Sequence, residues 1–297
     1  MDDNSSDIGV VTAREESYHP NRRLKAAAGA KGRRLILINP YRISPGIRNG
    51  RSGLWDLDKK GLPGVVLPRQ GAQIGNASLV VLSQFQAMGV PLANDVGAIL
   101  LARNKYLTLQ ALSTNRIRVP DSFFVNSPSL FWAGIEHLGG WPVVVKKPSG
   151  RQGRDVFLIR EAGEGETCLA NLDPAQGLLL QRFIPPEGRK DLRVLVIGKK
   201  VSAAMELVAA KGDFRSNYHV SGSGTPVELP DEIEQTAVAS AQALGLVIAG
   251  VDLIIDASGT AFVIEVNYAP GFKGMEAATG RDIAAEIITY ALSLISV

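Results

Sequence analysis

The sequence predicts an α/β protein whose first third is built on a parallel sheet. The first observation is a strand, helix and strand at residues 8–13, 20–30 and 34–39, the arrangement of a βαβ unit. The second is that apolar strands and helices keep alternating, as expected of a sheet covered by crossover helices. The third is size, because 297 residues with 45% hydrophobic content can bury a sizeable core in two or three compact units.

The other elements of the first third follow from turn residues and periodicity. Residues 41–61 are rich in glycine, arginine and turn formers, so we expect a loop or a small excursion there. Residues 64–67 are predicted to form a short apolar strand. Residues 78–88 repeat apolar side chains at helical spacing until Gly89 ends the helix. A further helix is predicted over residues 102–112.

The rest of the chain is predicted to consist mostly of strands. Pro120 and Pro128 separate short strands and loops. Apolar strands are expected at residues 141–145, 156–159, 178–184, 193–197 and 201–207, and a helix over residues 231–244 is ended by Gly245. After a hairpin, a final helix is expected to have Thr279 as its N-cap, with Asp282 three residues further on.

The hairpin before that helix carries the first chemical signal. Residues 250–256 and 261–267 form two predicted strands joined by a four-residue turn. If Asp256 pairs with Ala261, Asp252 stands opposite Glu265, and Asn267 shares their face. Carboxylates opposed across strands repel each other, which favours a cation between them, and all-oxygen ligands suit Mg²⁺, Mn²⁺ or Ca²⁺. Taken alone, the hairpin is equally consistent with two solvated carboxylates.

A glycine-rich loop gives the second signal. It lies between the strands at 141–145 and 156–159 and reads Lys146-Lys147-Pro148-Ser149-Gly150-Arg151-Gln152-Gly153-Arg154-Asp155. Glycine lets backbone N–H groups approach phosphate oxygens, and a lysine at a strand end adds a fixed positive charge. The loop matches neither the Walker A motif nor the dinucleotide-binding fingerprint. Taken alone, it is more often an ordinary solvated loop.

Two arginines give the third signal. Arg193 belongs to one of the predicted strands, and Arg215 follows the strand at 201–207. Each alone is a routine surface arginine. Together with the hairpin carboxylates they would balance the charge of a metal–triphosphate, because arginine binds phosphate through a planar two-pronged contact.

The order of these segments resembles a known superfamily. In chain order they are Lys105, Lys146 with its glycine-rich loop, Gln181-Arg182-Phe183-Ile184, Asp191-Leu192-Arg193, Phe214-Arg215-Ser216-Asn217, Gly250-Val251-Asp252, and Glu265-Val266-Asn267 before Pro270-Gly271. This order resembles the ATP-grasp superfamily and, within it, the RimK-type α-L-glutamate ligases. The resemblance implies an ATP-grasp fold with an N-terminal pre-ATP-grasp α/β domain (residues 1–101), a central subdomain with a lid loop (102–181) and a C-terminal subdomain with the metal site (182–297).

The resemblance also implies a role for each matched residue. Contacts to ATP would come from Lys105, Lys146, Ser149, Gly150, Gly153, Gln181, Arg182, Phe183, Ile184, Asp191 and Arg215. Catalytic contacts to the terminal phosphate and to an acyl phosphate would come from Arg193, Arg215 and Asn217. Asp252, Glu265 and Asn267 would hold Mg²⁺ or Mn²⁺. Arg182 departs from the family pattern, which usually has an acidic residue at that point of the hinge.

The implied activity is ATP-dependent ligation of an amine to a carboxylate through an acyl phosphate. The resemblance implies glutamate as the donor, and a protein C-terminus is one of several possible acceptors. Two alternatives stay open: an ATP-grasp kinase, which would release a stable phosphorylated product, and a non-catalytic nucleotide-regulated binding protein. The complete set of Asp252, Glu265 and Asn267 argues against the second.

Composition narrows the partners. The net charge of +3 is too modest to indicate nucleic acid, and no apolar run approaches the roughly 20 residues that span a bilayer. Cys168 is the only cysteine, so the chain has no internal disulfide. We therefore expect a cytoplasmic protein, and a homo-oligomer. A cluster of basic residues between positions 14 and 34 is interpreted as a solvated face, ahead of an acidic partner or a contact between copies.

Overall fold

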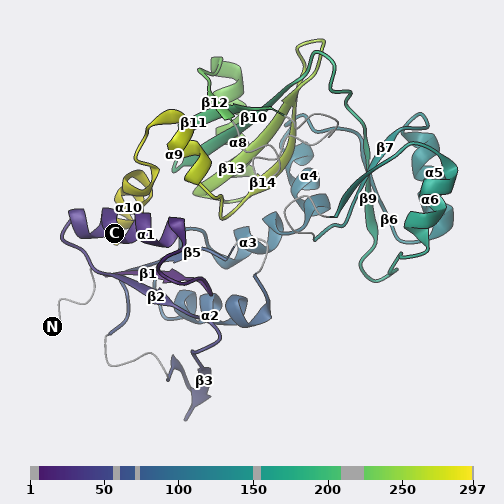
Figure 1. Ribbon diagram of the computed structural model, residues 1–297. Coiled ribbons are helices and arrows are strands. Elements are labelled where there is room, and N and C mark those ends of the chain that lie inside the picture. Colours follow the sequence, from purple (N-terminus) through teal and green to yellow (C-terminus); the bar gives the residue numbers. More distant parts are fainter. Residues whose placement is uncertain (1–6, 56–60, 71–73, 150–154, 209–223, 296–297) are drawn as a thin grey trace.

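The computed structural model describes residues 7–55, 61–70, 74–149, 155–208 and 224–295, and those residues form three sheets and a separate hairpin (Figure 1). The strand orders are β2-β1-β5, β6-β9-β7-β8 and β12-β11-β10-β13-β14, and the hairpin is β3-β4. No helix in this described part of the chain is long and apolar enough to cross a membrane.

The N-terminal sheet is parallel, as predicted. Its central strand β1 (Ile8–Val11) pairs with β2 (Leu35–Ile38) and with β5 (Val65–Pro68), and helix α1 (His19–Ala30) makes the crossover between β1 and β2. All four residues of β1 are buried. Helix α2 (Asn76–Ala87) follows β5. The βαβ prediction is therefore confirmed.

Residues 41–61 do not form only a loop. Strands β3 (Pro45–Arg48) and β4 (Arg51–Leu54) pair as an antiparallel hairpin that projects from the N-terminal sheet, at the bottom of Figure 1. Asn49 and Gly50 form the two-residue turn with φ values of 51° and 70°. Asn-Gly is the sequence that a type I′ hairpin turn favours, because both positions need a positive φ. The hairpin agrees with the small excursion that was one of the two expectations, but the prediction did not use this turn signal.

The helix predicted over residues 102–112 is in fact part of a pair of helices. Helix α3 (Val96–Ala102) ends first, and α4 (Lys105–Thr114) starts after a break. Asn104 is the N-cap of α4, and its side-chain oxygen accepts hydrogen bonds from the N–H groups of Tyr106 and Leu107 at 3.0 and 3.1 Å. An asparagine side chain that satisfies the free N–H groups starts a new helix. The cap places Lys105 at the first position of α4.

The central sheet contains four antiparallel strands. They are β6 (Ser122–Val125), β9 (Leu178–Arg182), β7 (Val143–Lys146) and β8 (Val156–Ile159). Helices α5 (Pro128–His137) and α6 (Ala162–Leu169) lie together on one side of this sheet (Figure 1), and Phe131 of α5 is fully buried in the shared core. The opposite side is left free to face the C-terminal sheet.

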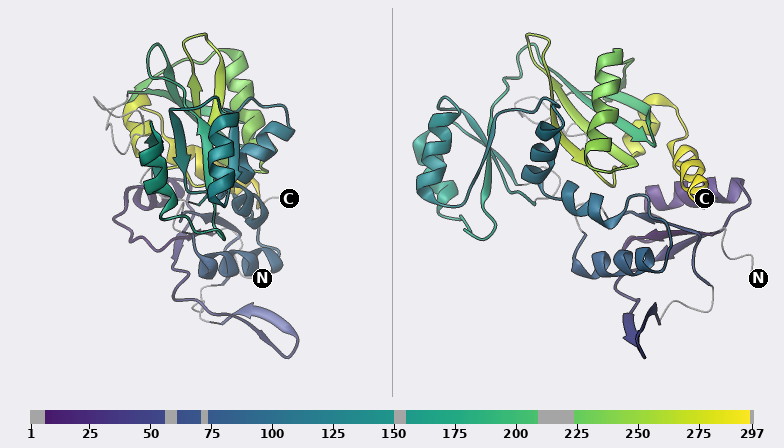
Figure 2. Two further views of the ribbon diagram at one scale, coloured as in Figure 1. Left: turned by 90° about the vertical axis from the view of Figure 1, so that its right-hand side faces the viewer. Right: turned by 180° about the vertical axis from the view of Figure 1, so that it is seen from behind.

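The C-terminal sheet is also antiparallel. It consists of β10 (Lys190–Ile197), β11 (Lys200–Leu207), β12 (Gly224–Pro226), β13 (Ile248–Ile255) and β14 (Ala261–Asn267). Helix α8 (Asp231–Ala243) covers one face, as the view from behind in Figure 2 shows. The predicted strand and helix positions agree with these elements to within a few residues.

The start of the last helix differs from the prediction. Thr279 is the final residue of α9 (Lys273–Thr279), and Gly280 ends that helix with a left-handed φ of 68°. Helix α10 (Ile283–Ser293) begins after Asp282, whose side chain accepts a hydrogen bond from the N–H of Ala285 at 2.9 Å. Helix α10 packs against α1, so the C-terminal end of the chain returns to the N-terminal unit (Figure 1).

Asn94 connects the first third of the chain to the C-terminal sheet. Its side-chain oxygen accepts from the N–H groups of Val247 and Ile248 at 2.6 and 2.9 Å. Its amide nitrogen donates to the carbonyls of Ile248 and Tyr268, both at 2.8 Å. The residue is 1% exposed. All four hydrogen bonds of a buried amide are therefore made, and they fix the start of β13 beside the segment that follows β14.

Candidate active site

Asp252 and Glu265 are direct neighbours across β13 and β14, as predicted, but not through the predicted register. Ile255, not Asp256, pairs with Ala261, and a β-bulge near Ile264 then restores the pairing of Asp252 with Glu265. The bulge adds one residue to β14, which offsets the one-residue error in the assumed register. Asp256 instead stabilises the turn, where its side chain accepts hydrogen bonds from the backbone of the following residues.

Asp252 is neutralised by an arginine on the neighbouring strand. Arg193 lies directly opposite Asp252 across β10 and β13, and its Nε and Nη2 donate to the two carboxylate oxygens at 2.7 and 2.6 Å. Burial raises the pKa of the Asp252 carboxyl, and the Arg193 guanidinium opposes that shift. Asn267 Nδ2 donates to Asp252 Oδ2 at 3.2 Å. The predicted Asp252, Asn267 and Arg193 thus form one connected group.

Glu265 is paired with a lysine from another part of the chain. Lys105 Nζ lies 3.0 Å from Glu265 Oε1, and the contact joins the first turn of α4 to β14. Burial alone would raise the pKa of Glu265, but Lys105, Lys146 and Arg193 together outweigh burial and hold that pKa below its usual range. Glu265 therefore stays an ionised carboxylate beside the cleft.

Lys146 ends β7 and is almost fully buried. Its Nζ donates to Gln181 Oε1 at 2.6 Å, and the amide nitrogen of Gln181 in turn donates to Ser122 Oγ at 3.0 Å. Burial lowers the pKa of Lys146 to about 8, because the ammonium loses its water. The charge of Glu265 opposes this shift and that of Lys105 adds to it. A buried lysine without a directly paired carboxylate is well suited to receive an anion.

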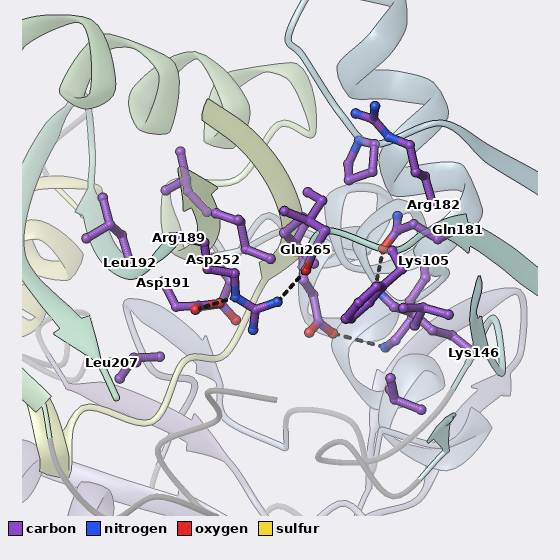
Figure 3. Close-up of a pocket in the computed structure, with 18 residues that line it drawn as sticks. Lys105, Lys146, Gln181, Arg182, Arg189, Asp191, Leu192, Leu207, Asp252 and Glu265 are labelled. Carbon is purple, nitrogen blue, oxygen red and sulfur yellow. Dashed lines mark hydrogen bonds and ion pairs between the residues drawn. The ribbon is translucent and has the colours of Figure 1, made fainter. Parts of the chain in front are cut away.

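The two lysines, Gln181 and the carboxylates of Asp252 and Glu265 line one cleft between the central and C-terminal sheets (Figure 3). Its lining contains two lysines and three carboxylates, with Lys105 in contact with Glu265 in the close-up, and apolar side chains complete it. The predicted residues on its wall are Lys105, Lys146, Gln181, Arg182, Phe183, Ile184, Asp191, Asp252 and Glu265.

The connection between the sheets contains a buried arginine that sequence reasoning missed. Arg189 Nη1 donates to the carbonyl of Ile184 at 2.8 Å, and its Nε donates to Asp191 Oδ2 at 2.9 Å (Figure 3). Its side chain is 5% exposed. The only local signal is the spacing of two between Arg189 and Asp191, which places their side chains on one side of an extended segment.

Arg182, which departs from the family pattern, has its own partners. Its guanidinium lies 5.2 Å from the centre of the Phe262 ring, in a cation–π contact, and its Nε lies 3.6 Å from Asp121 Oδ2. Arg182 therefore packs across from β9 to β14, from the central sheet to the C-terminal one, at the edge of the cleft.

The remaining predicted site residues fall into two groups. Arg193 and Asn267 are not part of the cleft lining and reach the site through Asp252. Ser149 is exposed, and it is not part of that lining either. Gly150, Gly153, Arg215 and Asn217 lie outside the described residues.

The donor set fits a magnesium ion. Two carboxylates and a side-chain amide come together here, and hard oxygen donors are what Mg²⁺ prefers. Ion pairing to Arg193 and Lys105 leaves lone pairs on the carboxylate oxygens for a metal. In the described part of the chain no three histidines, cysteines or acidic residues gather into a metal site, so this set depends on the amide of Asn267 as its third ligand.

A cleft between two antiparallel sheets, lined by lysines and carboxylates, is the arrangement that the resemblance to the ATP-grasp superfamily implies. Family comparison agrees along the chain. The RimK pre-ATP-grasp domain matches residues 7–99, and the RimK-like ATP-grasp domain matches residues 102–291. The chain therefore belongs to the RimK-like ATP-grasp family, and it is an ATP-dependent ligase that forms carbon–nitrogen bonds.

Relatives of the chain support the same family assignment. The chain is 37% identical over 286 residues to a Shewanella amazonensis protein named probable alpha-L-glutamate ligase 2, a match that covers 95% of this chain and 94% of that protein. It is 38% identical over 288 residues to a probable alpha-L-glutamate ligase of Pseudoalteromonas translucida, with the same coverage.

Solved structures share the fold. The ATP-grasp ligase PsnB, complexed with a minimal precursor, has a TM-score of 0.77 at 20% identity and covers 98% of this chain and 99% of its own. D-alanine–D-alanine ligase from Bacillus anthracis, complexed with ATP, has a TM-score of 0.71 at 18% identity and covers 98% of this chain and 97% of its own. The ATP-grasp fold predicted from the sequence is confirmed.

Proposed function

We propose that this ligase joins the amino group of glutamate to a carboxylate of a peptide or protein acceptor. One observation carries the proposal: two lysines, Lys105 and Lys146, line the same cleft between two sheets as the carboxylates of Asp252 and Glu265, and Lys105 contacts Glu265 at 3.0 Å. That arrangement supplies cations for phosphates and oxygen donors for a metal in one place. The relatives named alpha-L-glutamate ligases support glutamate as donor, and PsnB, solved with a precursor peptide, supports a peptide acceptor.

We assign the nucleotide to the cleft. Lys105 and Lys146 would bind its phosphates, and the segment from Gln181 to Ile184 would contact adenine. Asp191, fixed by Arg189, would lie beside the nucleotide. Asp252, Glu265 and Asn267 would hold Mg²⁺, a metal with which PsnB has also been solved together with ADP. We further propose contacts from Ser149, Gly150, Gly153, Arg215 and Asn217.

Charge governs the chemistry. The acceptor carboxylate attacks the γ-phosphorus of ATP, the bond to the β,γ-bridging oxygen breaks, and ADP leaves. A bound Mg²⁺ would neutralise part of the negative charge on the phosphates. Lys146, Lys105 and Arg193 place further positive charge beside this reaction, and such fixed charges lower its barrier without reorganising water. The glutamate nitrogen then attacks the acyl carbon, phosphate leaves, and the nitrogen loses a proton.

We propose that the chain divides into three functional units, at residues 1–101, 102–181 and 182–297. The family models meet between residues 99 and 102, which supports the first boundary.

We also propose a cytoplasmic homo-oligomer. Dependence on ATP supports the compartment, and light scattering on the purified protein tests the oligomer.

The decisive experiment measures ADP release by the purified protein with Mg²⁺, ATP, glutamate and an acceptor peptide, followed by mass spectrometry of the product. The expected result is a mass increase of one or more glutamate residues. Hydroxylamine in place of glutamate should give a hydroxamate, whereas a kinase would give none. ADP release without a new amide would contradict the proposal.

A further inference from the structure

The projecting hairpin carries charges that the active site does not use. Arg48 and Arg51 are directly opposite each other across β3 and β4, on either side of the Asn49-Gly50 turn. Both side chains are exposed. Like charges in direct opposition destabilise a pair of strands. Neither arginine has an ion pair or hydrogen bond within the described residues, so nothing there compensates the repulsion.

The two arginines share a face with an aromatic ring. Gly46 pairs with Gly53, and the alternation of side chains puts these glycines, Arg48, Arg51 and Trp55 on one face of the hairpin. A Cβ at Gly46 or Gly53 would lie only 3.1 or 3.3 Å from the Trp55 ring, so the glycines let the indole lie flat on the strands. Trp55 is 46% exposed.

The opposite face is the one that holds the hairpin in place. Ser52 accepts a hydrogen bond from Gln84 Nε2 of α2 at 3.3 Å. Ile43 and Leu54 at the base pack against the hydrophobic core. The face with Arg48, Arg51 and Trp55 makes none of these contacts and is exposed to solvent, as is Ile47 near the tip of the opposite face.

The charge of the hairpin indicates what kind of partner it would bind. Residues 39–55 contain three arginines and no acidic residue. By contrast, several cations of the early basic cluster are neutralised within the chain, as Arg23 is by Glu276 and Asp282. We propose that the face of the hairpin with Arg48, Arg51 and Trp55 is an exosite for an acidic polypeptide segment, with the arginines paired to its carboxylates and the indole packed against its backbone. The inference rests on the proposed function, because each ligated glutamate adds negative charge to the acceptor.

Fluorescence anisotropy with a labelled peptide of about ten glutamates tests the exosite directly. We expect the full-length protein to bind it, and expect R48Q/R51Q to weaken binding about tenfold or more, because two charge-assisted contacts are lost. The matched control, K31Q/R33Q, removes the same charge from an exposed segment after α1 and should change the affinity less than about twofold. Thermal unfolding checks that both variants are folded.

Several outcomes would overturn the exosite. Equal losses of affinity in both double variants would show that the peptide is attracted by the overall charge of the protein. Tight binding of a peptide of glutamines would exclude recognition of charge. Preference for single-stranded RNA would identify a different partner. Binding does not require ligation, so the two proposals fail separately. Absence of a glutamate product with intact peptide binding would remove only the proposed ligation of glutamate to a peptide. Ligation without any peptide binding would remove only the exosite.

Discussion

Arg193 and Asp252 form a two-pronged ion pair across β10 and β13, with both nitrogen–oxygen distances below 2.8 Å. The pair places a predicted catalytic cation in contact with a predicted metal ligand. It therefore couples the position of the guanidinium to the state of the metal site, and both can be tested by substitution.

Replacing Arg193 by lysine should impair catalysis although the charge is kept. Lysine cannot reproduce the planar two-pronged contact with Asp252. We expect the rate of ligation to fall about 10²-fold, the scale of one lost preorganised donor. Steady-state ADP release gives the rate. A variant with the normal rate would show that Arg193 only balances charge.

Glu265→Gln should remove most ligation by weakening metal binding. The amide can still accept from Lys105, so the 3.0 Å contact need not be lost. Calorimetric titration of Mg²⁺ in the presence of ADP measures the affinity, and Glu232→Gln on the exposed side of α8 is the control. Unchanged Mg²⁺ affinity in the Glu265 variant would refute the metal assignment.

Nucleotide affinity should depend on pH through Lys146. Its pKa in the free protein is about 8, and phosphate binds the ammonium form. Below pH 8 most of the ammonium is already present, so Lys146 should add little pH dependence to the ATP dissociation constant. As the pH rises above 8, binding must take up a proton, so the dissociation constant should increase. Calorimetry in buffers of different ionisation enthalpy measures that uptake, and Lys146→Arg should abolish it.

The same lysine should affect stability in the opposite direction. Burial favours neutral Lys146 in the folded chain, so between pH 8 and the ordinary value of 10.5 the unfolded chain binds more protons. The contribution of Lys146 to the free energy of unfolding therefore becomes more favourable as the pH rises through this window. Denaturant titrations of the wild type and Lys146→Met at pH 7.5 and 9.5 measure the difference. An equal gap between the two proteins at both pH values would contradict the buried, titrating lysine.

Arg189→Met should weaken ATP binding more than catalysis. The substitution keeps a long apolar side chain but removes the hydrogen bonds to Ile184 and Asp191. The segment proposed to contact adenine then loses its support, and we expect KM for ATP to rise about tenfold, with a smaller change in kcat. A lower kcat at unchanged KM would place Arg189 in the chemical step instead.

Asn94→Ala should destabilise the whole protein. It leaves the N–H groups of Val247 and Ile248 and two carbonyls without their partner. Because each unsatisfied buried group costs about 1–3 kcal/mol, the free energy of unfolding should fall by about 3 kcal/mol or more. Urea unfolding measures the loss. Asn115→Ala at the exposed end of α4 is the control and should cost less than about 1 kcal/mol.

Sequence alone determined the features that depend on neighbours in the chain. The βαβ opening, the strand pairs and the opposition of Asp252 and Glu265 follow from side-chain periodicity and short turns, and the order of the motifs gave the family. Even here the bulge at Ile264 escaped prediction, because an extra residue in a strand leaves no clear mark in an apolar run. The Asn49-Gly50 pair, by contrast, is a sequence signal for a hairpin turn.

Only the tertiary structure decided which distant groups meet. Lys105 reaches Glu265 across 160 positions, Asn94 reaches Ile248 across 154, and Arg189 turns inward to hold a carbonyl. Periodicity shows which face of an element is apolar, but it does not show which element covers that face. Those choices come from the packing of three sheets into one molecule, where each buried charge or amide must find its partner.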